Sequence, residues 1–372
     1  MPVERLFIVT NPMPTHNNSP AVSLGKFVQV VLGAGYSPRI IGARLPEKIP
    51  GVPDTVPVRS FRYGGKGIFK MLSFLLLQIK TFFYCLANCR KGDAVYFWIA
   101  DKMIGAFLGA KLKGAEINYF LYGKVFADGD GGLSEKLVRF MMNRATYVCA
   151  EAPSVFGQWG VGDSYDRDSI NLFVPQSGVT PIPFEERSLN VAMYCRLSIG
   201  KHIDDAIRAF CAVKERFPEY RLKIIGGGPI EADVRNLVRE LRADGFITVT
   251  GWLDHGEALK TVADSRVLLY PTDAEGVPGG ILEAMSLGVP ALASPVGGIP
   301  DLIESDVDGM FLASPDADTI ARELETVLAT GTPQEMSRAA MRKIKEKFSL
   351  ESAAANFKAV RAEHTDRQKG NN

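Results

Sequence analysis

Short runs of apolar and β-branched residues recur along the chain, and segments long enough for helices separate them. A first series of these strand-like runs comprises Leu6–Thr10, Ala94–Trp98, Ile117–Leu121 and Tyr147–Ala150. A second series comprises Val191–Cys195, Leu222–Gly226, Ile247–Gly251, Val267–Pro271 and Ala291–Ser294. Alternation of strands and helices over this length is typical of parallel sheets with helices on both faces. The pattern therefore predicts an α/β protein with two Rossmann-like halves.

A proline-rich stretch, Val174–Pro183, separates the two series. We therefore expect an amino-terminal domain over residues 1–178 and a carboxy-terminal domain over residues 187–349. Residues 350–372 have the composition of one more helix.

Composition narrows the class of protein. With 372 residues, 46% of them apolar and 23% charged, the chain is an ordinary globular protein of two domains. A net charge of +1 gives no argument for nucleic-acid binding. Five cysteines without a CxxC pair, and four scattered histidines, predict no metal site and fit a reducing compartment. Since Met1–Arg5 is too short and too charged to begin a signal peptide, we expect a cytoplasmic protein.

One stretch departs from the alternation. The basic-apolar segment, Thr55–Gly92, contains no acidic residue, and Ile68–Leu86 within it is rich in Leu and Phe. Its cations are Arg59, Arg62, Lys66, Lys70, Lys80, Arg90 and Lys91. A membrane span is rejected because Lys70 and Lys80 interrupt the apolar run, and a central Lys costs about 2.5–3.5 kcal/mol on insertion. Two interpretations stay open: a core helix with basic ends, or a helix lying on an anionic membrane surface.

Two carboxylates, Glu275 and Glu283, lie on either side of a Gly/Pro turn that follows the strand-like run Val267–Pro271. We expect Glu275 on the loop after that strand and Glu283 near the start of the next helix, in the crevice where α/β sheets bind ligands. The amides of Gly279 and Gly280 would face an anion at the helix N-terminus. This arrangement suits a sugar attached to a diphosphate, with one carboxylate on sugar hydroxyls and the other on a ribose diol. The alternative is two unrelated surface charges.

Two cations precede this pair in the same half of the chain. Arg196 follows the strand-like run Val191–Cys195, and Lys201 comes five residues later, so both can reach one crevice. Arg offers a planar fork for phosphate, and Lys offers a point charge. Without an Asp-x-Asp or a His/carboxylate cluster, we expect no metal ion; protein cations and helix amides would stabilise a departing diphosphate. Alternatively, the two cations are ordinary surface charges.

Together these residues resemble a known family, the retaining glycosyltransferases of family four, which have the GT-B fold. The resemblance covers about residues 190–330 and rests on Glu275 and Glu283 with seven residues between them, Ala284, Gly288-Val289-Pro290, Ser294–Asp301, Arg196-Leu197, Lys201 and Gly226–Pro229. The chain departs from the family pattern at several places: Cys195 and His202 stand where Gly is usual, Asn11–Pro20 lacks a Gly-Gly pair, and Tyr122-Gly123-Lys124 stands where a His is frequent.

The resemblance implies transfer of a sugar, as by a hexosyltransferase, from a nucleotide-diphosphate sugar with retention, and two Rossmann-like domains facing a cleft. Glu275 would contact the donor sugar and Glu283 the ribose, and the last helix would pack back on the first domain. Further donor-binding candidates are Gly227, Gly297 and Gly298. Acceptor-side candidates, placed after strands of the first domain, are His16, Asn17, Tyr122 and Lys124.

The expected acceptor is a lipid-linked molecule or a surface glycan, with the protein in the cytoplasm or on the inner face of the plasma membrane. No cofactor is expected besides the nucleotide sugar as co-substrate. The main alternative is a non-catalytic sugar-nucleotide-binding subunit of a glycosylation complex. A second alternative is another GT-B enzyme, such as a sugar-nucleotide epimerase or a pyridoxal-phosphate phosphorylase.

Overall fold

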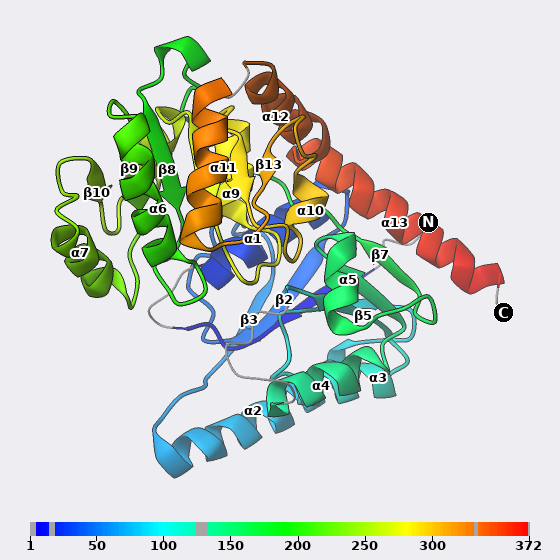
Figure 1. Ribbon diagram of the computed structural model, residues 1–372. Coiled ribbons are helices and arrows are strands. Elements are labelled where there is room, and N and C mark those ends of the chain that lie inside the picture. Colours follow the sequence, from blue (N-terminus) through cyan, green and yellow to red (C-terminus); the bar gives the residue numbers. More distant parts are fainter. Residues whose placement is uncertain (1–4, 15–18, 124–131, 331–333, 371–372) are drawn as a thin grey trace. The chain divides into compact units, whose positions relative to one another are not determined.

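The computed structural model describes residues 5–14, 19–123, 132–330 and 334–370 (Figure 1). The chain forms two compact units. Unit 1 comprises Met1–Tyr122, Phe126–Phe173 and Leu350–Asn372, and unit 2 comprises Gly123–Val125 and Val174–Ser349. The chain therefore returns to unit 1 after completing unit 2.

A seven-stranded parallel sheet forms the centre of unit 1. Its strands run in the order β3 (Val58–Phe61), β2 (Pro38–Ala43), β1 (Leu6–Thr10), β4 (Ala94–Trp98), β5 (Glu116–Leu121), β6 (Tyr147–Ala150) and β7 (Arg167–Ser169). The strands β1 and β4 are buried along their whole length, as expected where helices cover both faces of a parallel sheet. The predicted α/β architecture is therefore confirmed for this half of the chain.

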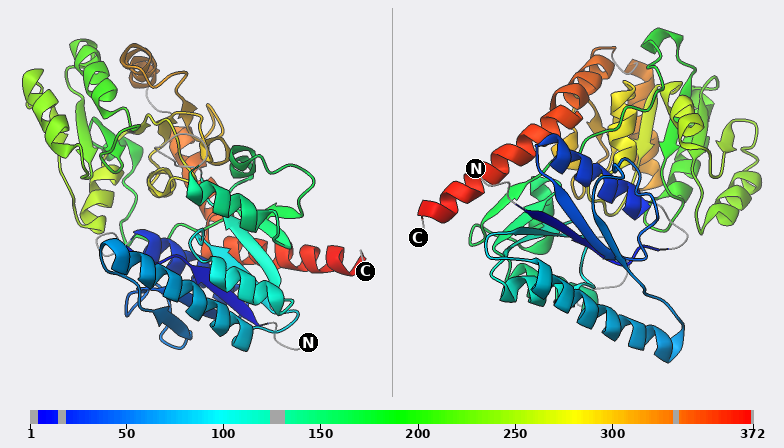
Figure 2. Two further views of the ribbon diagram at one scale, coloured as in Figure 1. Left: turned by 90° about the horizontal axis from the view of Figure 1, so that it is seen from below. Right: turned by 180° about the vertical axis from the view of Figure 1, so that it is seen from behind.

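Two groups of helices cover the sheet of unit 1 (Figures 1 and 2). The helices are α1 (Ser19–Gly33), α2 (Gly67–Asn88), α3 (Ile104–Leu112), α4 (Leu133–Met142), α5 (Pro153–Trp159) and α13 (Leu350–Gly370). Alternate residues of β4 point to opposite faces: Trp98 stacks on Phe27 of α1, with 4.5 Å between ring centroids, whereas Phe97 packs on Phe107 of α3. The helix α13 packs on the same side of the sheet as α1, with 6.0 Å between the ring centroids of Phe357 and Phe27.

Ion pairs hold α13 on unit 1. Arg361, 1% exposed, pairs with Glu116 of β5, and His364 contacts Asp166 at 2.7 Å between Nδ1 and Oδ2. Burial alone would raise the pKa of Glu116, but the hydrogen bond from His364 and the charge of Arg361 lower it to about 2. Glu116 is therefore an ionised carboxylate that joins two elements far apart in the sequence.

The helix α2 lies along the side of unit 1 that also carries α3 and α4 (Figure 1). Its buried residues are Leu77, Thr81 and Cys85, so the interpretation as a buried core helix is wrong. By length and composition, α2 is also a helix that could cross a bilayer. Here it packs along one side on α3, and the other side is exposed.

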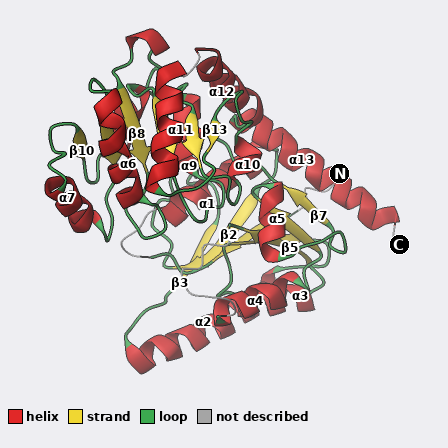
Figure 3. Cartoon of the chain, in the orientation of Figure 1, coloured by secondary structure: helices red, strands yellow, loops and turns green. Residues whose placement is uncertain are grey.

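Unit 2 is built on a six-stranded parallel sheet (Figure 3). The strand order is β10 (Ile247–Val249), β9 (Arg221–Ile225), β8 (Asn190–Tyr194), β11 (Val267–Tyr270), β12 (Ala291–Ala293) and β13 (Met310–Phe311). Its helices are α6 (Ile203–Arg216), α7 (Glu231–Glu240), α8 (His255–Ala263), α9 (Gly279–Ser286), α10 (Ile299–Leu302), α11 (Ala317–Thr330) and α12 (Gln334–Lys347), with a short 3₁₀ turn at Phe184–Glu186. Apolar clusters fill both faces of the sheet.

Both sheets contain a point at which the strand order reverses. In unit 1 it lies between β1 and β4, and in unit 2 between β8 and β11. In α/β sheets, the loops at the carboxyl ends of strands flanking such a point form the ligand-binding crevice. The fold therefore directs the search for a site to the loops after these four strands.

Candidate functional site

In unit 2, the two loops at the reversal point are joined by hydrogen bonds. The Asp273 amide donates to the carbonyl of Gly200 at 3.0 Å, and the Thr272 hydroxyl donates to the same carbonyl at 3.3 Å. A third loop also holds Thr272: its amide donates to Oγ of Ser294, the residue after β12, at 3.0 Å. Side chains on the loops after β8 and β11 are thereby held in fixed positions relative to one another.

A cation and a carboxylate meet at the centre of these loops. Lys201 Nζ donates to Glu275 Oε1 and, at 3.2 Å, to Thr272 Oγ1. The hydroxyl of Tyr270 donates to the same Glu275 oxygen at 2.8 Å. Both charged side chains are 16% exposed. The structure thus brings together two residues that the sequence predicted separately, and the tyrosine that ends β11 completes the cluster.

The second carboxylate oxygen of Glu275 makes no hydrogen bond with any residue in the described ranges. It can therefore accept a hydrogen bond from a ligand hydroxyl. Arg196 is exposed and has no hydrogen bond or ion pair within the part of the chain that the structure describes. Lys201 lies two residues before α6, which begins at Ile203.

The helix α9 supplies an N-terminus and the second carboxylate. It begins at Gly279, so the amides of Gly279 and Gly280 belong to its first turn, and neither donates to a described residue. Glu283, one turn further on, contacts His255 Nε2 at 3.2 Å. Burial raises the pKa of Tyr194, and the charge of Glu283 and a hydrogen bond with it raise that pKa further. Glu283 is thus held between the end of β8 and the start of α8.

Of the predicted glycines, Gly297 and Gly298 lie where two backbones meet, and Gly227 lies against side chains. A Cβ on Gly297, whose φ is +61°, would lie 1.8 Å from the carbonyl oxygen of Glu275, and the amide of Gly298 donates to the carbonyl of Gly276 at 2.8 Å. A Cβ on Gly227 would meet the ring of Trp252 at 2.6 Å. These contacts show that the loop after β12 supports the backbone of Glu275.

His202 adds a titratable group to the same loop. Its ring lies between two carboxylates, with 2.9 Å from Nδ1 to Asp205 and 2.6 Å from Nε2 to Asp273. Burial alone would lower the pKa of His202, but hydrogen bonds to Asp273 and Asp205 and their charges raise it above its ordinary value. The neighbouring Cys195 is a protonated thiol, because burial raises its pKa to about 12.

The reversal point of unit 1 carries a different network. Asp101, which is 4% exposed, accepts hydrogen bonds from Asn11 Nδ2 and Ser134 Oγ. Tyr122 packs edge-to-face on Trp159, and burial together with Asp101 raises the pKa of its hydroxyl. Tyr122 is therefore the acceptor-side candidate that the structure places. His16, Asn17 and Lys124 lie outside the described residues.

Neither a metal cluster nor a cavity adds residues to this site in the part of the chain that the structure describes. Within the described ranges, no cluster of three or more His, Cys, Asp or Glu could hold a metal ion. A cavity of about 520 Å³ in unit 2 lies at the amino ends of β8 and β9, near Asn190 and Arg221. That is the opposite edge of the sheet from Lys201 and Glu275, so we assign it no part in the site.

Sequence reasoning missed several of these groups. They are Tyr194, His202, His255, Tyr270, Thr272 and Asp273 in unit 2, and Asn11 and Asp101 in unit 1. Tyr194 and Tyr270 carried a usable signal, since each is a polar-tipped residue that ends a buried strand. His255 carried none, because its contact with Glu283 depends on how α8 packs beside α9.

Comparison with known proteins finds a family whose model matches part of the chain. Residues 181–347 match the model of the family described as Glycosyl transferases group 1. The chain is similar to a putative colanic acid biosynthesis glycosyltransferase, WcaL, of Escherichia coli (strain K12), with 29% identity over 39% of this chain and 37% of that protein. It is also similar to sulfoquinovosyl transferase SQD2 of Arabidopsis thaliana, with 29% identity over 60% of this chain and 45% of that protein. The chain thus spans less than half the length of these curated relatives.

Solved structures share the whole fold. Anabaena HepE in complex with UDP superposes with a TM-score of 0.73 at 15% identity and covers 97% of this chain and 100% of HepE. The pneumococcal O-GlcNAc transferase GtfA, in complex with UDP and GlcNAc, superposes with a TM-score of 0.74 at 12% identity, covering 98% and 100% of the two chains. The predicted GT-B fold is therefore confirmed.

Proposed function

We propose that this chain, which has a GT-B fold and matches the Glycosyl transferases group 1 family over residues 181–347, transfers a sugar from a nucleotide-diphosphate sugar to an acceptor. The acceptor is a glycan or a lipid-linked molecule, and the reaction belongs to polysaccharide or glycan biosynthesis. The observation that carries this proposal is the Lys201–Glu275 cluster at the reversal point of unit 2, with the first turn of α9 following in the same loop.

The donor diphosphate would be bound by Arg196, Lys201 and the amides of Gly279 and Gly280. Arg196 supports this role because it is exposed and unpaired among the described residues, so binding a phosphate breaks no existing ion pair. Lys201 balances the leaving group's growing negative charge as the sugar departs. The first-turn amides of α9 add partial positive charge.

The sugar and ribose contacts are assigned to the two carboxylates. Glu275 offers its second oxygen to hydroxyls of the donor sugar, while Tyr270 and Lys201 hold the first. Glu283, held by His255 and Tyr194, would accept from the ribose diol. Close packing of Gly297 on the Glu275 backbone fixes the loop that carries the first of these contacts.

The stereochemical part of the proposal is retention with a hexose donor, as in family four. We assign no covalent nucleophile in this cluster: Glu275 is assigned to hydroxyls of the donor sugar, and the Cys195 thiol stays protonated. Attack from the face of the leaving group, with the diphosphate accepting the acceptor's proton, is consistent with that arrangement. No metal ion or further cofactor is part of the proposal.

The proposal also includes a cellular location. We assign the protein to the cytoplasm, at the inner face of the plasma membrane, with the basic-apolar segment as the contact.

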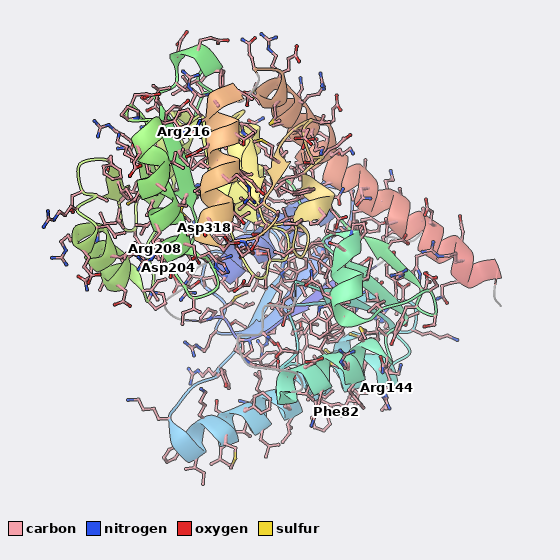
Figure 4. All side chains as sticks on the ribbon, in the orientation of Figure 1. Phe82, Arg144, Asp204, Arg208, Arg216 and Asp318 are labelled. Atoms are coloured by element: carbon pink, nitrogen blue, oxygen red, sulfur yellow. The ribbon has the colours of Figure 1, made fainter. Side chains whose placement is uncertain are left out.

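Ligand-induced stabilisation tests the donor site directly. UDP, GDP, ADP and CMP would be compared by thermal unfolding, with UDP first because the HepE and GtfA structures contain it. A ligand at 100 times its dissociation constant stabilises the fold by about 2.7 kcal/mol. We expect one nucleotide to raise the melting temperature of the wild type and of Arg208→Ala, an exposed arginine of α6 (Figure 4), but not of Arg196→Ala. Equal shifts in Arg196→Ala would contradict the assignment.

A non-catalytic sugar-nucleotide-binding subunit is the second candidate. It is favoured by Tyr122 in place of the histidine frequent in the family and by the missing Gly-Gly pair in Asn11–Pro20. Release of free nucleotide that requires an acceptor, and that disappears in Glu275→Ala, would exclude it. Release without any acceptor would instead indicate an epimerase or a hydrolase.

A further inference from the structure

The exposed side of α2 carries large apolar side chains in a continuous stripe. Phe69 is 72% exposed and Phe83 is 60% exposed, at the two ends of the stripe. The other exposed apolar residues of α2 are Ile68, Met71, Leu72, Leu75, Leu76 and Ile79. They recur at spacings of three and four, so they lie on one face of the helix. Contiguous exposed apolar patches mark sites of interaction.

The position of α2 is fixed by close helix packing. A Cβ on Gly105 of α3 would lie 2.1 Å from the carbonyl oxygen of Gln78, and one on Gly109 would lie 2.4 Å from that of Phe82. The Gln78 side chain also holds the amino-terminal end of α3, accepting from the Gly105 amide at 2.9 Å and donating to the carbonyl of Lys102, just before the helix, at 3.0 Å. The apolar stripe is therefore presented by a helix that is anchored along its opposite side.

Neighbouring helices also expose apolar side chains. Leu112 of α3 is 73% exposed, and Leu108 of α3 and Phe140 of α4 are also exposed. The charges along α2 are of one sign: Lys66, Lys70 and Lys80 are exposed, and residues 55–92 contain no carboxylate. An apolar stripe flanked by cations is the pattern of a helix that lies in the interface of an anionic bilayer.

A pocket of about 470 Å³ opens beside this helix. Its lining is Arg44, Ser60, Phe61, Arg62, Tyr63, Gly64 and Ser73, and contains no acidic side chain. Ser73 belongs to α2 and accepts a hydrogen bond from the Gly64 amide at 3.1 Å, so the pocket and the helix share a wall. Within the described part of the chain, neither the Arg44 nor the Arg62 side chain makes an ion pair or hydrogen bond, although the Arg44 amide donates to the Phe61 carbonyl at 3.1 Å. Two unpaired guanidinium groups in one pocket suit a phosphate.

We propose that the exposed face of α2 docks on an anionic phospholipid bilayer and that the Arg44–Arg62 pocket binds the phosphate of a lipid headgroup. The apolar stripe would enter the acyl-chain boundary, and Lys66, Lys70 and Lys80 would lie at the level of the headgroups. The proposal rests on residues of unit 1 alone. It therefore stands or fails independently of the donor site in unit 2.

Charge favours lipid over a second copy of the chain. In a two-fold symmetric contact the same patch meets itself, so cations of one copy would face cations of the other without a carboxylate in the segment to balance them. An anionic bilayer supplies the missing charge, worth about 1 kcal/mol for each Lys or Arg near its surface. The bilayer also covers a long convex stripe without needing shape complementarity.

Vesicle flotation tests the proposal on the purified full chain. The vesicles would contain phosphatidylcholine alone or a mixture with phosphatidylglycerol. We expect binding to the mixture and little to phosphatidylcholine alone, with a strong decrease in about 1 M salt. Leu72→Glu/Leu76→Glu should abolish binding, whereas Val307→Glu, an exposed apolar residue of unit 2, should leave it unchanged. All these positions are exposed, and circular dichroism would verify folding.

A second pair of variants isolates the pocket. Arg44→Gln/Arg62→Gln should lower the affinity for the mixed vesicles about thirtyfold, because two cations worth about 1 kcal/mol each are lost. Arg90→Gln/Lys91→Gln removes the same charge beyond the other end of α2 and should have a smaller effect. Equal losses in the two pairs would overturn the headgroup pocket. No binding of the wild type to mixed vesicles, or a dimer that Leu72→Glu/Leu76→Glu dissociates, would overturn the docking.

Discussion

The two units share one topology but carry different chemistry at the same place. In unit 2, the crevice between β8 and β11 contains a cation, Lys201, bonded to the carboxylate of Glu275. In unit 1, the equivalent crevice between β1 and β4 contains a carboxylate, Asp101, bonded to the neutral groups of Asn11 and Ser134. The strand order fixes where a ligand can bind, whereas a few loop side chains decide what it can be.

Under the proposed function, this difference would give the two crevices separate tasks. A diphosphate needs positive charge, which unit 2 supplies through Lys201, Arg196 and the first turn of α9. A buried acceptor such as Asp101 favours hydroxyl donors instead. This comparison supports a donor site in unit 2 and leaves unit 1 for a neutral, hydroxyl-bearing ligand.

The largest expected effect would come from removing the cation of unit 2. Lys201→Met should reduce turnover about 10²–10³-fold, since loss of one group that stabilises developing charge costs about 2.7–4 kcal/mol. Steady-state rates with a nucleotide sugar, and nucleotide affinity by calorimetry, would measure it. Asp101→Asn is the matched change in unit 1. It should lower the free energy of unfolding but leave nucleotide affinity unchanged; equal losses of nucleotide affinity in both variants would break the comparison.

A second prediction concerns how the Glu116 carboxyl of unit 1 makes the stability of the protein depend on pH. The pKa of Glu116 is about 2 in the folded protein, against an ordinary value of 4.5. A carboxyl whose pKa is lowered by folding stabilises the protein above its unfolded pKa, and this stabilisation disappears as the pH falls through its folded pKa. The shift corresponds to about 3 kcal/mol at neutral pH.

Urea unfolding at several pH values would test this second prediction. The difference in unfolding free energy between wild type and Glu116→Gln should be largest at pH 7 and should shrink between about pH 4.5 and pH 2. Arg187 of unit 2 offers a control, because it binds the carbonyls of Gly288 and Leu287 at 2.7 and 3.1 Å. Since carbonyl groups do not titrate, the contribution of these bonds to the free energy of unfolding should stay constant over this pH range. A difference that stays constant over this range would show that Glu116 is not the group responsible.

The smallest expected effect concerns His202 beside the proposed diphosphate site. Because the pKa of His202 is raised, its positive charge persists above the ordinary range and is lost as the pH rises through the shifted value. Nucleotide-diphosphate affinity should fall over that interval by up to about fivefold, the range of an exposed ion pair. Titrations of wild type and His202→Gln between about pH 6 and pH 9 would compare them. The variant should show a flat profile, and a slope shared by both would point to another group.

The sequence predicted the strands that are buried on both faces. The bounds of β1, β4 and β6 match their expected ranges, since an uninterrupted apolar run has one plausible environment in such a fold. It missed β7, where Arg167, Asp168 and Ser169 are polar and Asp168 is bonded by Tyr147 and Arg367. It also missed β13, which has two residues, and β2, which begins with a proline and contains a glycine.

The site, like the fold, was predictable only where the local sequence pattern carries the information. The local sequence pattern was enough to find Glu275, Glu283 and Lys201, because each follows a predicted strand or lies near the start of a predicted helix. Their partners Tyr270, His255 and Tyr194 acquire a role only when β8, β11 and α8 come together. The exposed face of α2 shows the limit most clearly: an apolar helix of this composition fits a core and a membrane surface equally well, and only its packing on α3 decides which side is free.

The return of the chain to unit 1 has a consequence for how the protein is made. Residues 350–370 form α13, whose Phe357 and Ala353 fill the core beside α1. Between Phe173 and Leu350 the ribosome must first synthesise Val174–Ser349, the main part of unit 2, which takes roughly ten to thirty seconds at about 5–20 residues per second. During that interval unit 1 lacks its last helix and keeps an apolar surface and the Glu116 carboxylate uncovered. The half of the molecule that is begun first is therefore completed last.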